Sequence, residues 1–135
     1  MIWYKVLIPL VIVLALVAVI EILTVQKPAP LFTIETISPT CMAENHELDI
    51  RAVGNSIVIT APIQTPNPCY SVVGDVKFSG MDIDVDLSAV SKQDVCIQCI
   101  GEVTGKVVIQ NLTKGIYGVK VKTPDKAAIT TIMIE

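Results

Sequence analysis

The chain has 135 residues and a formal net charge of −3, and 52% of its residues are hydrophobic while only 4% are aromatic. From Leu31 onward, eight Lys or Arg residues stand against twelve Asp or Glu residues. This mild acidity argues against nucleic acid or an anionic membrane surface as the partner, and the length beyond the apolar N-terminal segment allows one domain with a single core.

The N-terminal segment is apolar enough to cross a membrane. Residues 6–20 contain no charge, and apolar residues continue to Val25 around Glu21. About 20 such residues suffice for one transmembrane helix. No good signal-peptidase site follows, so we expect an uncleaved single-pass anchor over residues 1–25, with a cleaved signal peptide as the alternative. Lys5 precedes the apolar run, which predicts a cytoplasmic N-terminus and an extracytoplasmic C-terminal domain.

A Pro-rich linker and a series of short strands follow the anchor. Residues 26–30 read Gln-Lys-Pro-Ala-Pro, which ends the helix and favours an extended spacer. Residues 31–37 can form a strand that Ser38-Pro39 breaks. The next two runs, residues 48–52 and 57–63, alternate in polarity around Gly54-Asn55 and predict a hairpin.

The rest of the chain, from residue 65 on, also predicts strands. Two prolines make Thr65 to Cys69 a rigid corner. The further strands are expected at residues 71–79, 81–87, 95–103, 106–112, 116–123 and 129–134. Eight or nine short strands at regular spacing, without a convincing amphipathic helix, are typical of an antiparallel β-sandwich or barrel, and the size favours the sandwich.

The expected domain therefore covers residues 31–135 and is all-β. The turn and strand at residues 114–121 are typical of Ig-like and transthyretin-like modules, with Tyr117, Val119 and Val121 facing inward. A true antibody-type domain is disfavoured, because the single tryptophan lies in the anchor and not in a sheet.

Four cysteines lie in the part expected outside: Cys41, Cys69, Cys96 and Cys99. An oxidising compartment favours disulfides there. A zinc site usually draws its ligands from two close pairs, and only one pair is close. Four cysteines allow three pairings, and a bond between Cys96 and Cys99 is disfavoured if both lie on one strand, because their side chains would face opposite sides. Structural bridges are therefore expected.

Other candidate site residues have plain structural explanations. Asp82, Asp84 and Asp86 place carboxylates about 7 Å apart on one strand face, which makes them weak calcium candidates because the glycine turn of a calcium loop is missing. His46 has no second histidine and is expected to be a solvated loop residue. Asn111 begins an Asn-Leu-Thr glycosylation sequon.

Part of the chain, residues 65–121, resembles a loose group of archaeal, membrane-anchored extracytoplasmic domains. The likeness rests on three short motifs: Thr65-Pro66-Asn67-Pro68-Cys69, Cys96-Ile97-Gln98 and Gly115-Ile116-Tyr117-Gly118-Val119. In that group the Pro-Cys and Cys-x-Gln cysteines are partners. The resemblance therefore implies a bond between Cys69 and Cys96. Cys41 and Cys99 go beyond the pattern of the group, and we expect the second bridge between them. It implies no activity.

The sequence as a whole favours a protein that is not an enzyme. It contains no nucleophile elbow and no Gly-rich phosphate loop, and one histidine offers little acid–base chemistry. We expect a structural, accessory-subunit or protein-binding module without a cofactor. Protein partners or further copies would dock by strand addition at edge strands such as residues 31–37 or 129–134. The alternative is a thiol-disulfide exchange protein that uses Cys96 and Cys99.

Overall fold

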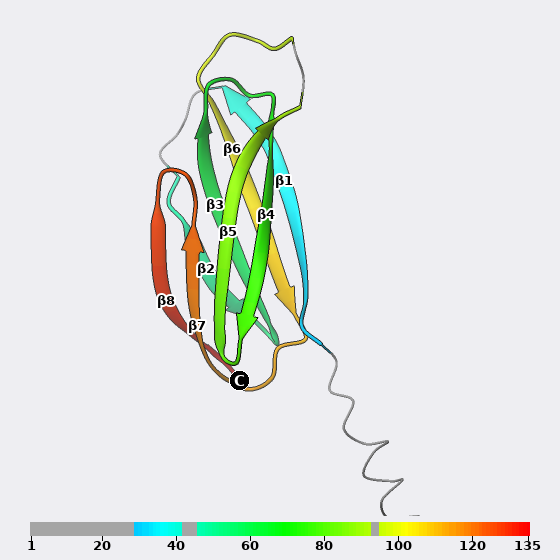
Figure 1. The fold of residues 1–135 in the computed structure, drawn as a ribbon, viewed down its shortest axis with the longest axis vertical. Helices are drawn as coiled ribbons and strands as arrows, with labels where there is room; N and C mark the ends of the chain where they lie inside the picture. Colours follow the sequence, from blue (N-terminus) through cyan, green and yellow to red (C-terminus); the bar gives the residue numbers. More distant parts are fainter. Residues whose placement is uncertain (1–28, 42–45, 93–94) are drawn as a thin grey trace, which may run out of the picture.

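The computed structural model describes residues 29–41, 46–92 and 95–135 (Figure 1). The anchor expected over residues 1–25 and most of the linker at 26–30 lie outside these residues. Within the described ranges, no helix has the length and apolar character needed to cross a bilayer.

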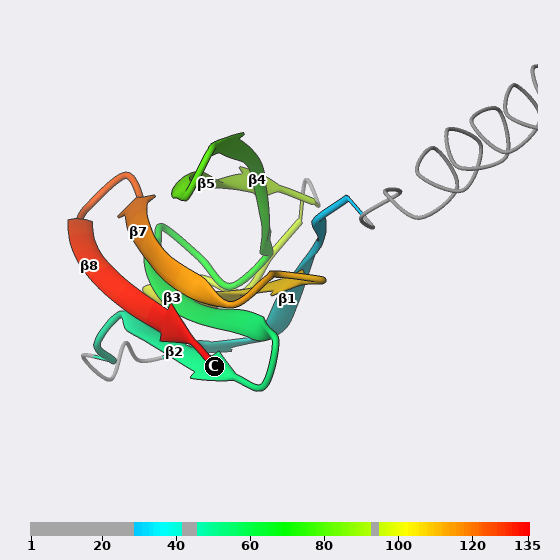
Figure 2. The same ribbon diagram turned by 90° about the horizontal axis from the view of Figure 1, so that it is seen from below.

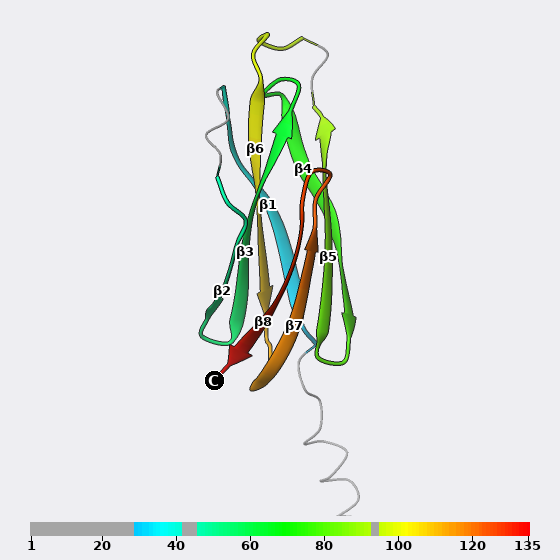
Figure 3. The same ribbon diagram turned by 90° about the vertical axis from the view of Figure 1, so that its left-hand side faces the viewer.

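The described residues form eight strands in two four-stranded sheets, with strand orders β1-β6-β3-β2 and β4-β5-β7-β8. The two sheets pack face to face, as Figures 2 and 3 show from below and from the side. The strands are β1 (Leu31–Cys41), β2 (Asp49–Val53), β3 (Ser56–Thr65), β4 (Tyr70–Ser79), β5 (Asp82–Ser91), β6 (Gly101–Gln110), β7 (Gly115–Lys122) and β8 (Ala127–Ile134).

Side-chain alternation creates the core between the sheets. In β5 the residues Ile83, Val85 and Leu87 are buried while the aspartates between them are exposed, as expected when successive side chains point to opposite faces. The predicted inward trio on β7 is confirmed, since Tyr117, Val119 and Val121 are all buried. The largest fully buried side chains are Ile57, Ile59, Ile63, Ile83, Leu87, Ile109, Val85, Val103, Val107, Val119 and Val121.

The predicted all-β fold with two sheets of antiparallel strands is confirmed, with one parallel exception. β5 and β7 are parallel neighbours, with Ile83 opposite Val119, whereas the sequence predicted antiparallel pairing throughout. The reason is the path of the chain: after β5 it crosses to the other sheet to form β6 and then returns. Such a crossover allows two strands of one sheet to run in the same direction.

One strand replaces two that the sequence predicted. Residues 95–103 and 106–112 were expected as separate strands around Thr104-Gly105, but β6 runs unbroken from Gly101 to Gln110, and residues 95–100 form a loop. Gly105 lies within the strand because β4 packs closely above it. A Cβ atom at position 105 would lie 2.7 Å from Cγ1 of Val72, so the glycine permits a close contact between the sheets and does not make a turn.

The first strand is longer than predicted. β1 continues past Ser38-Pro39 to Cys41, with an irregularity in its pairing to β6 between Ile37 and Thr40. The predicted break at Ser38-Pro39 is therefore wrong. Because β1 is an edge strand, a proline can remain in it when its missing N–H would have faced away from the sheet.

A tyrosine corner fixes the crossing from β6 to β7. The Tyr117 hydroxyl donates to the carbonyl oxygen of Thr113 at 3.0 Å, accepts from the Thr113 N–H at 3.1 Å and lies 3.1 Å from the Thr113 hydroxyl. Asn111 begins this turn in the left-handed region, with φ of 61°. A tyrosine near the start of a strand that bonds back to the preceding turn is a feature of Ig-like sandwiches.

The contact at Gly105 gives a first testable prediction. Gly105→Ala should lower the free energy of unfolding by about 1–2 kcal/mol, because overpacking costs more than the reduced chain entropy of alanine returns. Chemical denaturation measures this. If the cause is contact with Val72, the loss in a Val72→Ala background should be smaller, and an equal loss in both backgrounds would contradict the explanation.

The tyrosine corner gives a second prediction. Tyr117→Phe should destabilise the domain by about 1–3 kcal/mol, because it leaves partly buried backbone groups of Thr113 without their partner. Tyr70→Phe is the matched control, since the Tyr70 hydroxyl has no hydrogen bond among the described residues, and it should change the denaturation midpoint little. Equal losses of stability from Tyr117→Phe and Tyr70→Phe would show that the hydrogen bonds of the Tyr117 hydroxyl do not stabilise the domain.

Candidate functional site

Two disulfides close one end of the domain. Cys41 is bonded to Cys99 with a Cα–Cα distance of 5.8 Å, and Cys69 is bonded to Cys96 with a distance of 6.0 Å. The expectation of disulfides is therefore confirmed. The bond between Cys69 and Cys96 is the one that the resemblance implied, and Cys41 is bonded to Cys99 as expected. In Figure 1 this end lies opposite the start of β1, so the bridged end is far from the residues that follow the linker.

The Pro-rich corner before Cys69 is packed onto the start of β6. The Thr65 hydroxyl donates to the carbonyl oxygen of Asn67 at 2.7 Å, and the Asn67 side chain accepts from the Cys69 N–H at 3.0 Å. A Cβ at position 101 would come within 2.6 Å of the Asn67 and Pro68 backbone. Gly101 thus lets the corner and its cysteine approach the sheet closely.

The loop between β5 and β6 presents apolar side chains to solvent. Val95, Ile97 and Ile100 are 86%, 71% and 64% exposed, and they stand beside the two bridged cysteines of the same loop. Burial of apolar side chains therefore contributes little to holding this loop. Its described part is tied to β1 and to the start of β4 through Cys99 and Cys96, which restricts the conformations that a partner would meet.

A polar pair that the sequence did not reveal lies near the bridged end. The Glu102 side chain is only 8% exposed, and its Oε1 lies 2.6 Å from Nδ1 of His46, whose side chain is 57% exposed. His46 is thus largely solvated, as expected, but it also satisfies a buried carboxylate. The two residues are 56 positions apart, so no local sequence signal could have joined them.

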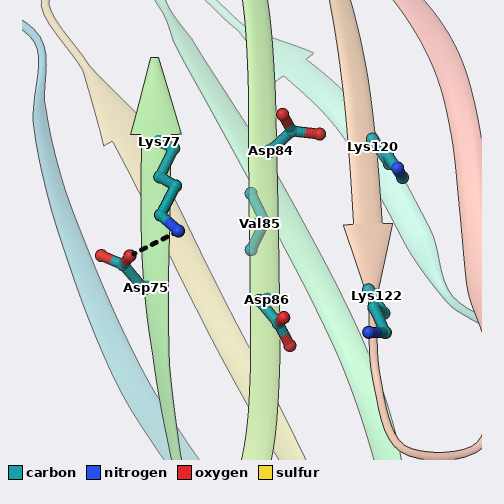
Figure 4. A pocket seen from close by; sticks show the side chains of 7 residues that line it. All are labelled: Asp75, Lys77, Asp84, Val85, Asp86, Lys120 and Lys122. Atoms are coloured by element: carbon teal, nitrogen blue, oxygen red, sulfur yellow. Dashed lines mark ion pairs between the residues drawn. The ribbon is translucent and has the colours of Figure 1, made fainter.

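Of the three aspartates of β5, Asp84 and Asp86 stand beside lysines, whereas Asp82 is paired in register with Ser79 and Gly118. Asp84 is paired in register with Lys77 and Lys120, and Asp86 with Asp75 and Lys122. Figure 4 shows these side chains around a shallow depression on the outer face of β4, β5 and β7, with the ion pair between Lys77 and Asp75 at 3.9 Å. Among the described residues, no three His, Cys, Asp or Glu side chains are placed to hold one metal ion.

The glycosylation candidate lies at the opposite end from the bridges. Asn111 is exposed, while the following Leu112 is buried and its N–H donates to the carbonyl oxygen of Asn55 at 3.1 Å. The sequon hydroxyl of Thr113 contacts Tyr117. The asparagine is therefore accessible, while the rest of the sequon belongs to the tyrosine corner.

The comparisons with known proteins leave the family of this chain open. No family model matches it, no curated protein matches it, and no solved structure matches it. The candidate features are therefore those that the geometry itself displays: a bridged end with an apolar loop, and a buried Glu102 paired with His46.

The bridges give a third prediction. Peptide mapping without reduction should yield Cys41 linked to Cys99 and Cys69 linked to Cys96, and no peptide that links Cys96 to Cys99. Replacing either bonded pair by serines should lower the free energy of unfolding by about 2–4 kcal/mol, because each bridge restricts the unfolded chain. Free thiols in the untreated protein would contradict the structure at this end.

Proposed function

We propose that this chain is a membrane-anchored, extracytoplasmic β-sandwich protein that serves as a structural, accessory-subunit or protein-binding module and not as an enzyme. The anchor is the apolar segment at residues 1–25, and the domain at residues 31–135 stands outside the cell membrane on the short linker at 26–30. The resemblance to archaeal membrane-anchored domains belongs to the same proposal.

One observation carries the proposal: all four cysteines are used in bridges that brace the end of the domain opposite β1. Disulfides persist in oxidising compartments, which agrees with an extracytoplasmic domain. A chain that enters β1 from the membrane would present the bridged end outward. That end carries exposed Val95, Ile97 and Ile100, and exposed apolar side chains on a braced scaffold suit recognition of a protein.

The finer assignment to Ig-like modules is supported by connectivity. β2, β3 and β6 are successive neighbours in one sheet, the chain crosses to the other sheet through the tyrosine corner, and β7 and β8 form a hairpin there. The same sequence of features occurs in Ig-like domains. The parallel neighbours β5 and β7 and the additional edge strand β1 depart from that pattern.

The alternative, thiol-disulfide exchange through Cys96 and Cys99, receives less support. Such a protein cycles one close pair between dithiol and disulfide at the start of a helix. Here each of the two cysteines is bonded to a distant residue, Cys69 or Cys41, and they lie in a loop that leads into a strand. Exchange would need both structural bridges to open.

The anchor is tested on the full chain in its own membrane. After alkaline carbonate washing the protein should stay in the membrane pellet, because a spanning helix is held by the bilayer core. Protease added outside intact cells should remove the domain at residues 31–135. A variant that lacks residues 2–25 should be lost from the pellet. Recovery of the full chain in the soluble fraction, or a domain that only lysis exposes to protease, would contradict the proposal.

A further inference from the structure

Four strands form the edges of the two sheets: β1 and β2 in one, β4 and β8 in the other. An edge strand offers unpaired backbone groups to any other strand. Proteins that must not pair there shorten the edge, charge it, interrupt it with proline or bulges, or cover it. The four edges of this domain differ in how far they are protected.

The β2 edge is short and blocked. β2 has five residues and carries Asp49 and Arg51, which form an ion pair at 3.6 Å. Beyond its end, the neighbouring strand β3 would have an open edge, but Pro62 has no N–H and the Gln64 N–H donates to Oδ2 of Asp125 at 3.4 Å. Pro62 and Gln64 are two residues apart, so their backbone nitrogens face the same edge of β3. Neither nitrogen can therefore donate a hydrogen bond to an added strand.

The β1 and β4 edges approach each other. The Val72 N–H of β4 donates to the Thr36 hydroxyl of β1 at 2.9 Å. β1 also carries Glu35 and the irregularity before Thr40, and β4 carries Asp75 and Lys77. Charge, irregular pairing and this contact between the two sheets protect both edges.

The β8 edge has no charge, no proline and no irregular pairing, and its only protection among the described residues is its approach to β2 of the other sheet. Its eight residues, Ala127–Ile134, include no charge and no proline, and all of them pair in register with β7 on the other side. Ile129 is 78% exposed and Met133 is 60% exposed, beside Ile116 of β7 at 62%. β8 is the one uncharged strand among the four edges described.

We propose that β8 pairs antiparallel with β8 of a second copy of this chain, about a two-fold axis at Thr131. This register places Ile129 opposite Met133 of the second copy and Thr131 opposite its own counterpart. Apolar pairs and Thr–Thr pairs stabilise antiparallel strands, and no charge of either β8 meets a like charge. The β4-β5-β7-β8 sheet of one copy and the same sheet of the second copy would join into one continuous sheet.

The pairing also fixes how the two copies are oriented. β8 ends at the same end of the domain where β1 begins, as Figure 1 shows. Antiparallel pairing of two β8 strands therefore puts the starts of the two β1 strands at opposite ends of the dimer. Given the anchor proposed above, on which this step rests, the two copies would belong to facing membranes. The partner is thus a second copy of this chain that is anchored in the opposing membrane.

A charge exchange at the two-fold axis tests the register. Full-length wild-type protein in phosphatidylcholine vesicles, with the domain outward, should cluster the vesicles in a light-scattering assay. Thr131→Lys alone and Thr131→Glu alone each place like charges opposite each other and should weaken self-association by about fivefold or more. Vesicles of the two variants mixed should cluster again, because opposite charges then meet at the axis.

Thr33→Lys, which adds the same charge to an exposed position of β1, is the matched control and should cluster like wild type. Single Thr131 variants that cluster like wild type, or a mixture that stays dispersed, would overturn the proposal. Flotation of the vesicles reports anchoring separately, so a chain that fails to float would refute the anchor alone. Sedimentation of the same variants in detergent would then still decide whether β8 pairs with itself.

Discussion

The fold depends on one continuous apolar layer between the inner faces of two sheets. Ile59 of β3 and Val107 of β6 face this layer from one sheet, and Val85 and Val119 face it from the other, all at 2% exposure or less. Full burial of such a side chain contributes roughly 1.5–3 kcal/mol. A slip of one residue in any inner strand would move its apolar side chains into water, so the layer fixes the strand register and, with it, the position of every turn and edge.

The apolar layer also explains where the fold needs interactions other than apolar packing between strands. The sheets meet closely at Gly105 and Val72, and a glycine is required there. At the tyrosine corner the chain leaves one sheet for the other, and a buried hydroxyl supplies the hydrogen bonds that a strand ladder would otherwise supply. The loop with Val95 and Ile97 lies outside the layer, and disulfides hold it instead.

Local patterns in the sequence predicted the parts that local patterns determine. Alternation over residues 48–63 gave the β2–β3 hairpin, and alternation over residues 116–121 gave the inward face of β7. The failures concern residues whose role depends on distant neighbours. Gly105 looked like a turn because Val72, far away in sequence, was not known to lie against it.

The same limit applies to the candidate site. The pairing of His46 with Glu102 spans 56 positions, and no periodicity reports it. Reasoning from the residues left two cysteine pairings open, and only the resemblance chose between them. The parallel contact of β5 with β7 depends on the order of crossings between sheets, which strand patterns alone do not encode.

Among the described residues, two surfaces suit the recognition role that we propose, and they differ in physical kind. The apolar loop at the bridged end offers shape and apolar area, which many partners can match. The β8 edge offers a row of directional backbone donors and acceptors, with Ile129 and Met133 exposed beside them. Directional groups fix both the register and the orientation of an added strand. If the domain is tethered at one end as we propose, orientation decides whether a partner can be reached within one membrane or only across two, so the edge carries more information about assembly than the loop does.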